Sequence, residues 1–291
     1  MGVELIRACP YCRFPIREKV FESENPAAVS GVYWSDGKEY LPFFSGGSRL
    51  LRCQNCGRFY WKNDAAAIGV CDPASDDAEK KPEAWEHVWI RDTVLPLEDC
   101  LLALENRIAV NDAQELYIRT LIWWGINDPI RYGKQKNVNR EHRDVFLSNA
   151  TRLRELYELV IVTVTRFAGE GRPVAVRLDS NGRPVVLEHP AHLLETCRLR
   201  CAEICRETGA FENGLSLLNE PYDLCGREAA ELRTLTEEKK GGVHRFTWSQ
   251  SGQSGPPREF VNTSGSTART RAKLEKQKRK AWEDLVDIFK Q

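Results

Sequence analysis

Apolar residues recur at helical spacing through the middle of the chain, and the pattern is clearest between residues 146 and 167. The apolar positions there are spaced by four and three residues, which places them on one face of a helix. A glycine pair, Gly169-Glu170-Gly171, follows and ends the pattern. One segment of this length is more typical of a core helix in a bundle than of a coiled coil. The residues that carry the pattern are Phe146, Ala150, Leu153, Tyr157, Val160, Val164 and Phe167.

The same periodicity predicts four further helices on either side of this segment. Proline suits the first turn of one of them, an asparagine cap opens another, and glycine ends a third. We expect Asn127-Asp128-Pro129 to stop the second helix, because proline disfavours a helical residue before it. The predicted segments are Pro96 to Ile108, Asn111 to Ile126, His189 to Gly209, and Phe211 to Leu218.

Two stretches show the pattern of β-hairpins instead. Residues 29–34 are rich in strand-forming side chains, Ser35-Asp36-Gly37 supplies a turn, and residues 38–44 return. Residues 174–187 contain a second pair of short strands around an Asn181-Gly182 turn. This second hairpin is an insertion in a helical region, where it either carries contacts or closes one end of the bundle.

Candidate chemistry is concentrated in two Cys-x-x-Cys motifs, which we call the first knuckle (Cys9 to Cys12) and the second knuckle (Cys53 to Cys56). Four thiolates in this spacing are typical of a closed tetrahedral Zn²⁺ site. Four sulfur ligands leave no open position for water or substrate, so we expect a structural zinc ion and no catalytic one. Gly57 follows the second knuckle at a position where positive φ is common.

The other cysteines give weaker signals. Cys197, Cys201 and Cys205 lie one helical turn apart on a predicted helix, among apolar neighbours. A metal or cluster there would need a fourth ligand and a polar surrounding, so we interpret these thiols as buried small hydrophobic groups.

These elements predict an α+β fold with a small zinc ribbon followed by a mainly α-helical bundle. Acidic residues and prolines fill a connector before the helices, and Gly, Ser, Pro and Thr fill a second connector after them. A terminal segment with seven basic residues and one acidic residue between 269 and 280 precedes an apolar end. The predicted parts are a ribbon with an inserted hairpin (1–71), an acidic linker (72–95), a helical domain (96–238), a flexible linker (239–265) and a basic amphipathic C-terminal helix (266–291).

Composition excludes several classes of protein. The chain has 291 residues with 42 Lys plus Arg and 42 Asp plus Glu, so no global field draws it to nucleic acid or membrane. No stretch reaches the roughly 18 consecutive apolar residues of a membrane span, and the start lacks the apolar core of a signal peptide. We therefore expect a cytoplasmic protein with reduced cysteines.

The sequence has no phosphate-binding loop, dinucleotide fingerprint or catalytic motif, and its five histidines are scattered.

Taken together, the ribbon, the turn Trp34-Ser35-Asp36-Gly37-Lys38 and a helical region carrying Trp123-Trp124 and Asn127-Asp128 resemble a group of poorly characterised bacterial proteins. Residues 202–215 resemble one helix-turn-helix unit of tetratricopeptide-like repeats, although Gly214 stands where alanine is usual. The resemblance implies a zinc ribbon followed by a helical, repeat-like region. It implies no reaction.

Two functions fit this sequence. The first is a non-catalytic adaptor or scaffold that binds protein partners, or a second copy of itself, through the ribbon, the helical body and the C-terminal helix. The second is a nucleic-acid-binding module in which basic and aromatic residues of the ribbon meet phosphates and bases. Residues 1–70 carry nine basic and seven acidic residues, so the adaptor is favoured. The candidate binding residues are Tyr33, Trp34, Arg52, Arg58, Tyr60, Trp61, Trp282 and Phe289.

Overall fold

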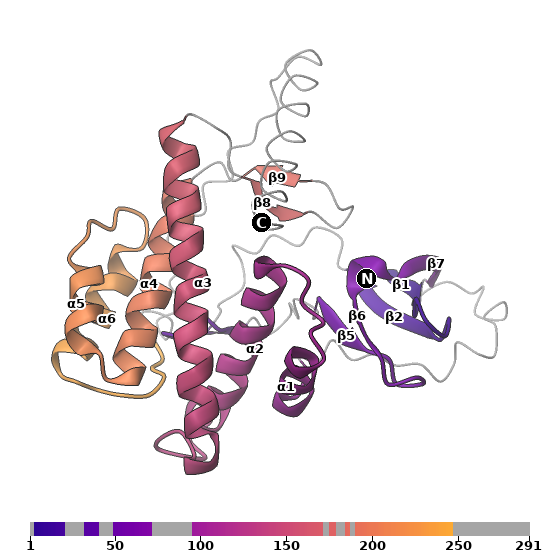
Figure 1. The fold of residues 1–291 in the computed structure, drawn as a ribbon, viewed down its shortest axis with the longest axis horizontal. Coiled ribbons are helices and arrows are strands. Elements are labelled where there is room, and N and C mark those ends of the chain that lie inside the picture. Colours follow the sequence, from indigo (N-terminus) through magenta and orange to yellow (C-terminus); the bar gives the residue numbers. More distant parts are fainter. Residues whose placement is uncertain are drawn as a thin grey trace. The chain divides into compact units, whose positions relative to one another are not determined.

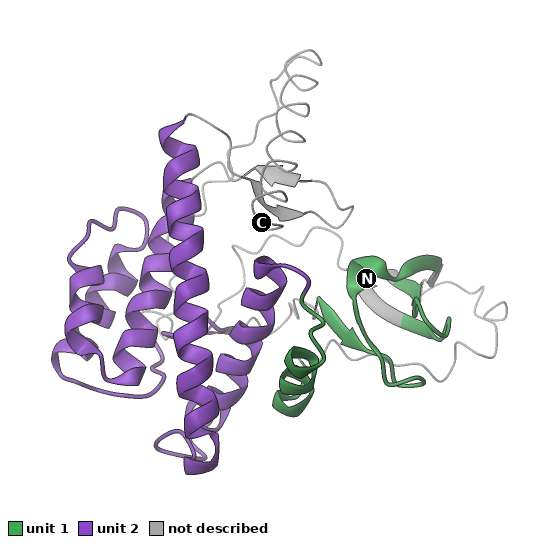
Figure 2. Ribbon diagram, viewed as in Figure 1, with its two compact units in different colours: residues 1–31, 40–109 green, residues 32–39, 110–291 purple. Residues whose placement is uncertain are grey.

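The computed structural model of the chain describes residues 3–20, 32–40, 49–71, 95–170, 175–178, 184–186 and 190–246. Within them it has six α-helices and several small antiparallel sheets, so the fold mixes α and β structure (Figure 1). The chain forms two compact units (Figure 2). Unit 1 comprises residues 1–31 and 40–109, and unit 2 comprises residues 32–39 and 110–291.

This division differs from the predicted domain limits at two places. Residues 32–39, expected as the hairpin of the ribbon, group with the helices of unit 2. Helix α1 (Leu97–Glu105), expected as the start of the helical domain, groups with the strands of unit 1. An ion pair between Arg52 and Asp99 at 2.5 Å and a hydrogen bond from the Trp61 indole to the Ile108 carbonyl at 3.3 Å join α1 and its following turn to the strands.

Unit 1 is built on a three-stranded antiparallel sheet that the sequence patterns did not predict. Its order is β2-β1-β7, with β1 (Val3–Ala8), β2 (Pro15–Val20) and β7 (Ala66–Cys71). Ile6 and Ala8 of β1 are buried while Arg7 between them is only half-buried, as expected for alternate faces of a strand. The short strands β5 (Leu50–Arg52) and β6 (Phe59–Trp61) pair across the second knuckle, and the 3-10 helix Lys62–Asp64 leads into β7.

Unit 2 is a helical assembly in which α3 packs against both α2 and α4. Helix α3 spans the predicted segment and ends at the predicted glycine, and α5 has the predicted limits. Helix α6, which packs against α4 and α5, was not predicted. The helices are α2 (Asp112–Arg131), α3 (Arg143–Gly169), α4 (Pro190–Thr208), α5 (Phe211–Leu218) and α6 (Gly226–Glu237), with a 3-10 turn at Arg140–His142 before α3.

The predicted stop of the second helix at Asn127-Asp128-Pro129 is wrong, because α2 continues through Pro129 to Arg131. Asn127 and Asp128 do not act as helix breakers. Their side chains bond to residues distant in the sequence, and these tertiary bonds hold the last turn in helical form.

Both predicted hairpins pair as strands. The first consists of β3 (Val32–Tyr33) and β4 (Glu39–Tyr40), and the second of β8 (Ala175–Leu178) and β9 (Pro184–Val186). The linker at 72–94, most of the linker at 239–265 and the C-terminal helix at 266–291, with Trp282 and Phe289, lie outside the described residues. In the described part of the chain, no helix has the length and apolar character that crossing a bilayer requires.

Candidate functional site

The two cysteine knuckles of unit 1 have the same backbone geometry. In each, the amide of the first cysteine donates to the carbonyl five residues later, from Cys9 to Phe14 and from Cys53 to Arg58, at 2.9 Å in both. The residue after the second cysteine donates back to the first, and it has positive φ, 62° at Arg13 and 71° at Gly57. This confirms the conformation expected at Gly57 and shows that arginine adopts it in the first knuckle.

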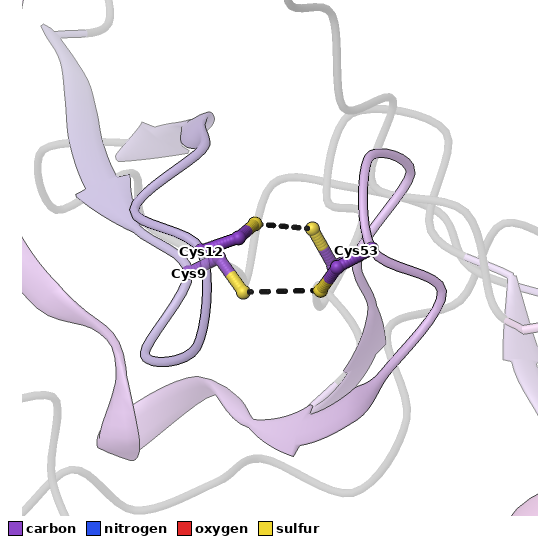
Figure 3. Close-up of side chains that lie close together, drawn as sticks. Cys9, Cys12 and Cys53 are labelled. Atoms are coloured by element: carbon purple, nitrogen blue, oxygen red, sulfur yellow. Dashed lines mark hydrogen bonds between the residues drawn. The ribbon is translucent and has the colours of Figure 1, made fainter.

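The repeated geometry brings the four sulfur atoms together. All four Sγ atoms lie within 4.8 Å of one another, and the pairs Cys9–Cys56 and Cys12–Cys53 are 3.9 Å and 3.5 Å apart. Figure 3 shows the thiols of Cys9 and Cys12 facing the second knuckle, which carries Cys53. A tetrahedral ion with 2.3 Å metal–sulfur bonds has sulfur–sulfur edges of about 3.8 Å. The observed spacings therefore fit a tetrathiolate metal site.

The thiols are not paired as disulfides, whose sulfur atoms would be about 2.05 Å apart. All nine cysteines whose side chains the structure describes are free. A hydrogen bond from Asn55 is the main cause that lowers the pKa of the Cys12 thiol to about 6, whereas burial raises the pKa of Cys53 to about 12. A bound dication would favour the thiolate form of all four and release their protons.

The cysteines also form the centre of the core of unit 1. Cys9 and Cys53 are buried with Ile16, Tyr60 and Ala65, and the other two cysteines pack against this cluster. A small domain buries little apolar surface, so a metal ion bound by these four sulfur atoms would contribute much of its folding free energy.

The predicted binding residues of unit 1 occupy different environments. Tyr60 is buried and Trp61 is half-buried. Arg52 pairs with Asp99, donates to the Gly57 carbonyl and lies over the Phe59 ring. Arg58 is exposed and lies over the ring of Tyr11, a residue that the sequence did not single out.

Beside the Arg58–Tyr11 pair lies a surface hollow of about 340 Å³. Tyr11 is 54 % exposed, and α1 forms the opposite wall. The lining is mainly apolar, and its polar side chains are the Arg58 guanidinium, the Asn106 amide and the Tyr11 hydroxyl. The lining residues are Tyr11, Gly57, Arg58, Phe59, Leu102, Asn106 and Ile108.

Unit 2 holds a second cluster of polar residues, which is buried. Asp36, in the turn between β3 and β4, has no exposed surface. Its carboxylate accepts hydrogen bonds from Arg131 and from the Asn127 amide, the latter at 3.2 Å. Burial raises the pKa of Asp36, and the neighbouring Arg131 opposes that rise. An ion pair buried this completely is costly unless further hydrogen bonds satisfy its atoms.

The same Asn127 amide joins Asp36 to a second carboxylate, Glu207 at the end of α4. Asn127 Nδ2 lies 3.1 Å from Glu207 Oε1, and the Trp123 indole donates to Oε2 at 2.6 Å. Burial, with Glu203 and Asp36 nearby, raises the pKa of Glu207 well above its usual value. Glu207 is therefore protonated over a range where an exposed glutamate is ionised.

A third buried group ties the chain after α6 to α4. Arg206 and Glu203 form an ion pair at 2.7 Å with both side chains fully buried. Arg206 also donates to the carbonyls of Lys240 and Gly242. These bonds hold residues 240–242 against α4.

Sequence reasoning did not identify this cluster as a site. In the sequence, the turn Trp34–Lys38 and the pairs Trp123-Trp124 and Asn127-Asp128 stand out only as parts of a resemblance. The structure brings all of them together, and their joint occurrence in the sequence was the available signal. Tyr33 and Trp34 consequently belong to unit 2 and not to a ribbon surface.

The three thiols Cys197, Cys201 and Cys205 are buried in α4, and desolvation raises the pKa of each. A raised pKa disfavours the thiolate that metal binding requires. This agrees with their interpretation as small hydrophobic groups.

Comparison of the chain with models of protein families, with curated proteins and with solved structures gives no match. The resemblance to bacterial zinc-ribbon proteins and to a tetratricopeptide-like unit therefore stays a prediction.

Proposed function

We propose that the protein is a non-catalytic adaptor or scaffold whose N-terminal unit is a ribbon held by one zinc ion on Cys9, Cys12, Cys53 and Cys56. The observation that carries this proposal is the convergence of four free thiols at spacings that fit a tetrahedral ion. Four sulfur ligands in a tetrahedron suit zinc or iron, and zinc is the usual ion of a closed structural site. With four sulfur ligands the ion has no free position, so its role is structural.

Among the described residues of unit 1, the hollow beside Arg58 and Tyr11 has the groups that suit a protein partner. An exposed aromatic ring, a guanidinium and an apolar floor are the groups that carry binding energy at protein interfaces. None of the ion pairs found in the described residues involves Arg58, so its charge remains available to an acidic side chain of a partner.

The metal part is tested by the variant Cys53→Ser in the full chain. We expect loss of bound zinc and rapid proteolysis within residues 1–71, with the helical circular dichroism signal largely kept. Ser216→Ala, which changes a hydroxyl in α5, serves as the control and should retain the metal. If the Cys53→Ser chain keeps protease resistance in residues 1–71, the structural role is contradicted.

The adaptor part is tested by affinity purification with the wild-type chain and with a Tyr11→Ala/Arg58→Ala variant. Gln54→Ala, an exposed change in the same knuckle, is the matched control. We expect a protein recovered with the wild type and the control to be lost with the double variant, at equal zinc content. Identical recovery with all three chains would exclude the hollow as the binding surface. A chain ending at residue 246, which keeps the segment packed against α4, would then test the C-terminal segment.

Nucleic-acid binding is the alternative, and exposed Arg58 beside Tyr11 is the observation that favours it. Tyr60 is buried and Arg52 is paired with Asp99, so fewer of the predicted residues can meet phosphates or bases. Fluorescence anisotropy with a mixed RNA and DNA pool tests it. Salt-dependent binding that Arg58→Ala weakens would support this function over the adaptor, and no binding at low salt would remove it.

A further inference from the structure

The turn Tyr33–Lys38, which we call the acidic turn, contacts the helices of unit 2 in the way a bound peptide contacts a receptor. Its central residue Asp36 is fully buried and meets Arg131 and Asn127 through its carboxylate. Its carbonyl oxygen accepts a hydrogen bond from the Trp124 indole at 3.0 Å. All three partners lie on the last turns of α2, so a single helix end recognises both the side chain and the backbone of Asp36.

A second wall of this site is formed by residues 242–246, which follow α6. The Ser35 amide donates to the His244 carbonyl and the His244 amide donates to Ser35 Oγ, both at 2.8 Å. The Phe246 amide donates to the Tyr33 carbonyl at 3.1 Å. The acidic turn therefore has strand-like pairing on one side and helix side chains on the other.

Both ends of the acidic turn are also recognised. Lys38 Nζ lies 2.6 Å from Asp128, and the Arg131 guanidinium lies 5.4 Å from the centre of the Trp34 ring. At Gly37, φ is 82° and a Cβ atom would collide with the Arg200 guanidinium, which donates to the Ser35 carbonyl at 2.9 Å. The positive φ favours glycine at this position, and a larger residue would also displace the Arg200 guanidinium from the Ser35 carbonyl, so the site discriminates by backbone conformation as well as by charge.

Two of the receptor side chains, Arg131 and Asn127, also have hydrogen bonds that do not involve the acidic turn. Arg131 still bonds to Asp128 and to the Trp124 carbonyl. Asn127 still bonds to Glu207, which also holds the Trp123 indole. Among the described residues, the partners of Asp36 are groups of the helices and the Lys38 amide of its own turn. Arg131 therefore keeps the Asp128 carboxylate as a counter-ion when the turn leaves.

We propose that unit 2 contains a binding site for an acidic turn, formed by Asn127, Asp128, Arg131, Arg200 and residues 242–246, and that the turn Tyr33–Lys38 of the same chain is its resident, exchangeable ligand. The ligand class is a short peptide with an aromatic residue, an aspartate, a glycine and a lysine in the order seen here. The turn and its receptor are about 90 to 210 residues apart in the sequence, as the separations of their bonded pairs show. The helices of unit 2 also pack directly on one another, α3 against α2 and α4, through contacts that do not involve the turn.

The test uses a fluorescein-labelled peptide of residues 32–40 and the full chain carrying Asp36→Ala, which disables the resident turn. We expect saturable one-to-one binding of the peptide to this variant, and binding at least about tenfold weaker to the wild-type chain, whose site is occupied. A peptide with alanine at the Asp36 position should bind the variant at least about tenfold more weakly. Glu220→Ala, an exposed change after α5, is a control that should behave like the wild type.

The proposal is overturned if the Asp36→Ala chain keeps its helical signal and cooperative unfolding but binds neither peptide, or binds both equally. Should this variant fail to fold, hydrogen exchange of the wild-type chain decides. The amides of Ser35, His244 and Phe246 should then exchange together and faster than those in the middle of α2 and α4. Exchange of these amides only through global unfolding would show that the turn is a fixed part of the core.

Discussion

Arg13 and Gly57 occupy equivalent positions in the two knuckles and have the same backbone conformation, although only glycine predicts it from the sequence. Glycine after the second knuckle predicted positive φ correctly, because glycine adopts that region without cost. The first knuckle has the same conformation at Arg13, and an arginine does not predict positive φ. The equivalence is visible only in the matching hydrogen bonds of the two loops.

Gly57→Ala is expected to destabilise unit 1 by roughly 1–2 kcal/mol, the cost of the left-handed region for a residue with a Cβ atom. The added Cβ meets no atom within 4 Å, so the backbone conformation alone accounts for the loss. Gly169→Ala, at the end of α3 and likewise in open space, is the control and should be neutral or mildly stabilising. Thermal unfolding of the zinc-loaded chains measures both, and equal effects would contradict the explanation.

Glu207 gives a prediction about pH. Its pKa is raised in the folded chain, so the folded state binds more protons than the unfolded state above the ordinary value of 4.5. Stability from this group is therefore full below pH 4.5 and is lost as the pH rises, by at most about 1.4 kcal/mol per pH unit. Glu207→Gln cannot ionise at this position and so imitates the protonated form. In urea unfolding, the free energy of unfolding of the variant should therefore rise relative to that of the wild type as the pH increases from 5 to 8. A difference that does not change with pH would contradict the raised pKa.

At the scale of elements, periodicity predicted the helices with long apolar faces and failed where tertiary bonds decide. Helix α3 and helix α5 follow their apolar residues and glycine ends closely. Helix α2 runs through Pro129 because Asn127 and Asp128 are held by Asp36 and Lys38, which lie about 90 residues away in the sequence. Local propensity carries no information about such partners.

Helix α6 was missed for a similar reason, since its start depends on a residue of another helix. The Glu195 carboxylate of α4 accepts hydrogen bonds from the amides of Asp223, Leu224 and Cys225, at 2.7–3.1 Å. These amides precede α6 and gather at its N-terminal end, where a negative charge is favourable. The carboxylate replaces the usual local cap.

Glu195→Gln should therefore destabilise unit 2 by about 1–3 kcal/mol, because an NH₂ group would replace an oxygen that accepts amide protons in a buried position. Glu220→Gln, an exposed acid nearby in the sequence, should change the free energy of unfolding by less than about 0.5 kcal/mol. Urea unfolding followed by circular dichroism compares the two. A loss no larger than that of the control would show that Glu195 is not the anchor of this helix start.

For the whole molecule, cysteine spacing predicted which four thiols come together, while the allocation of segments to units could not be predicted. Two Cys-x-x-Cys motifs require only local loops, so their chemistry is readable from sequence. The hairpin between them lies next to the knuckles in sequence, yet it packs with the helices through Asp36 and Arg131. A buried ion pair between distant segments leaves no periodic signal, and this is why the second cluster was found only in the structure.

The central claim is that four cysteines hold one zinc ion that stabilises unit 1. X-ray absorption at the zinc edge of the purified full chain tests it most directly, with metal content measured on the same sample. We expect one zinc per chain with four sulfur neighbours at about 2.3 Å and no nitrogen or oxygen neighbour. A chain that takes up no zinc, or zinc with fewer than four sulfur ligands, would contradict the account.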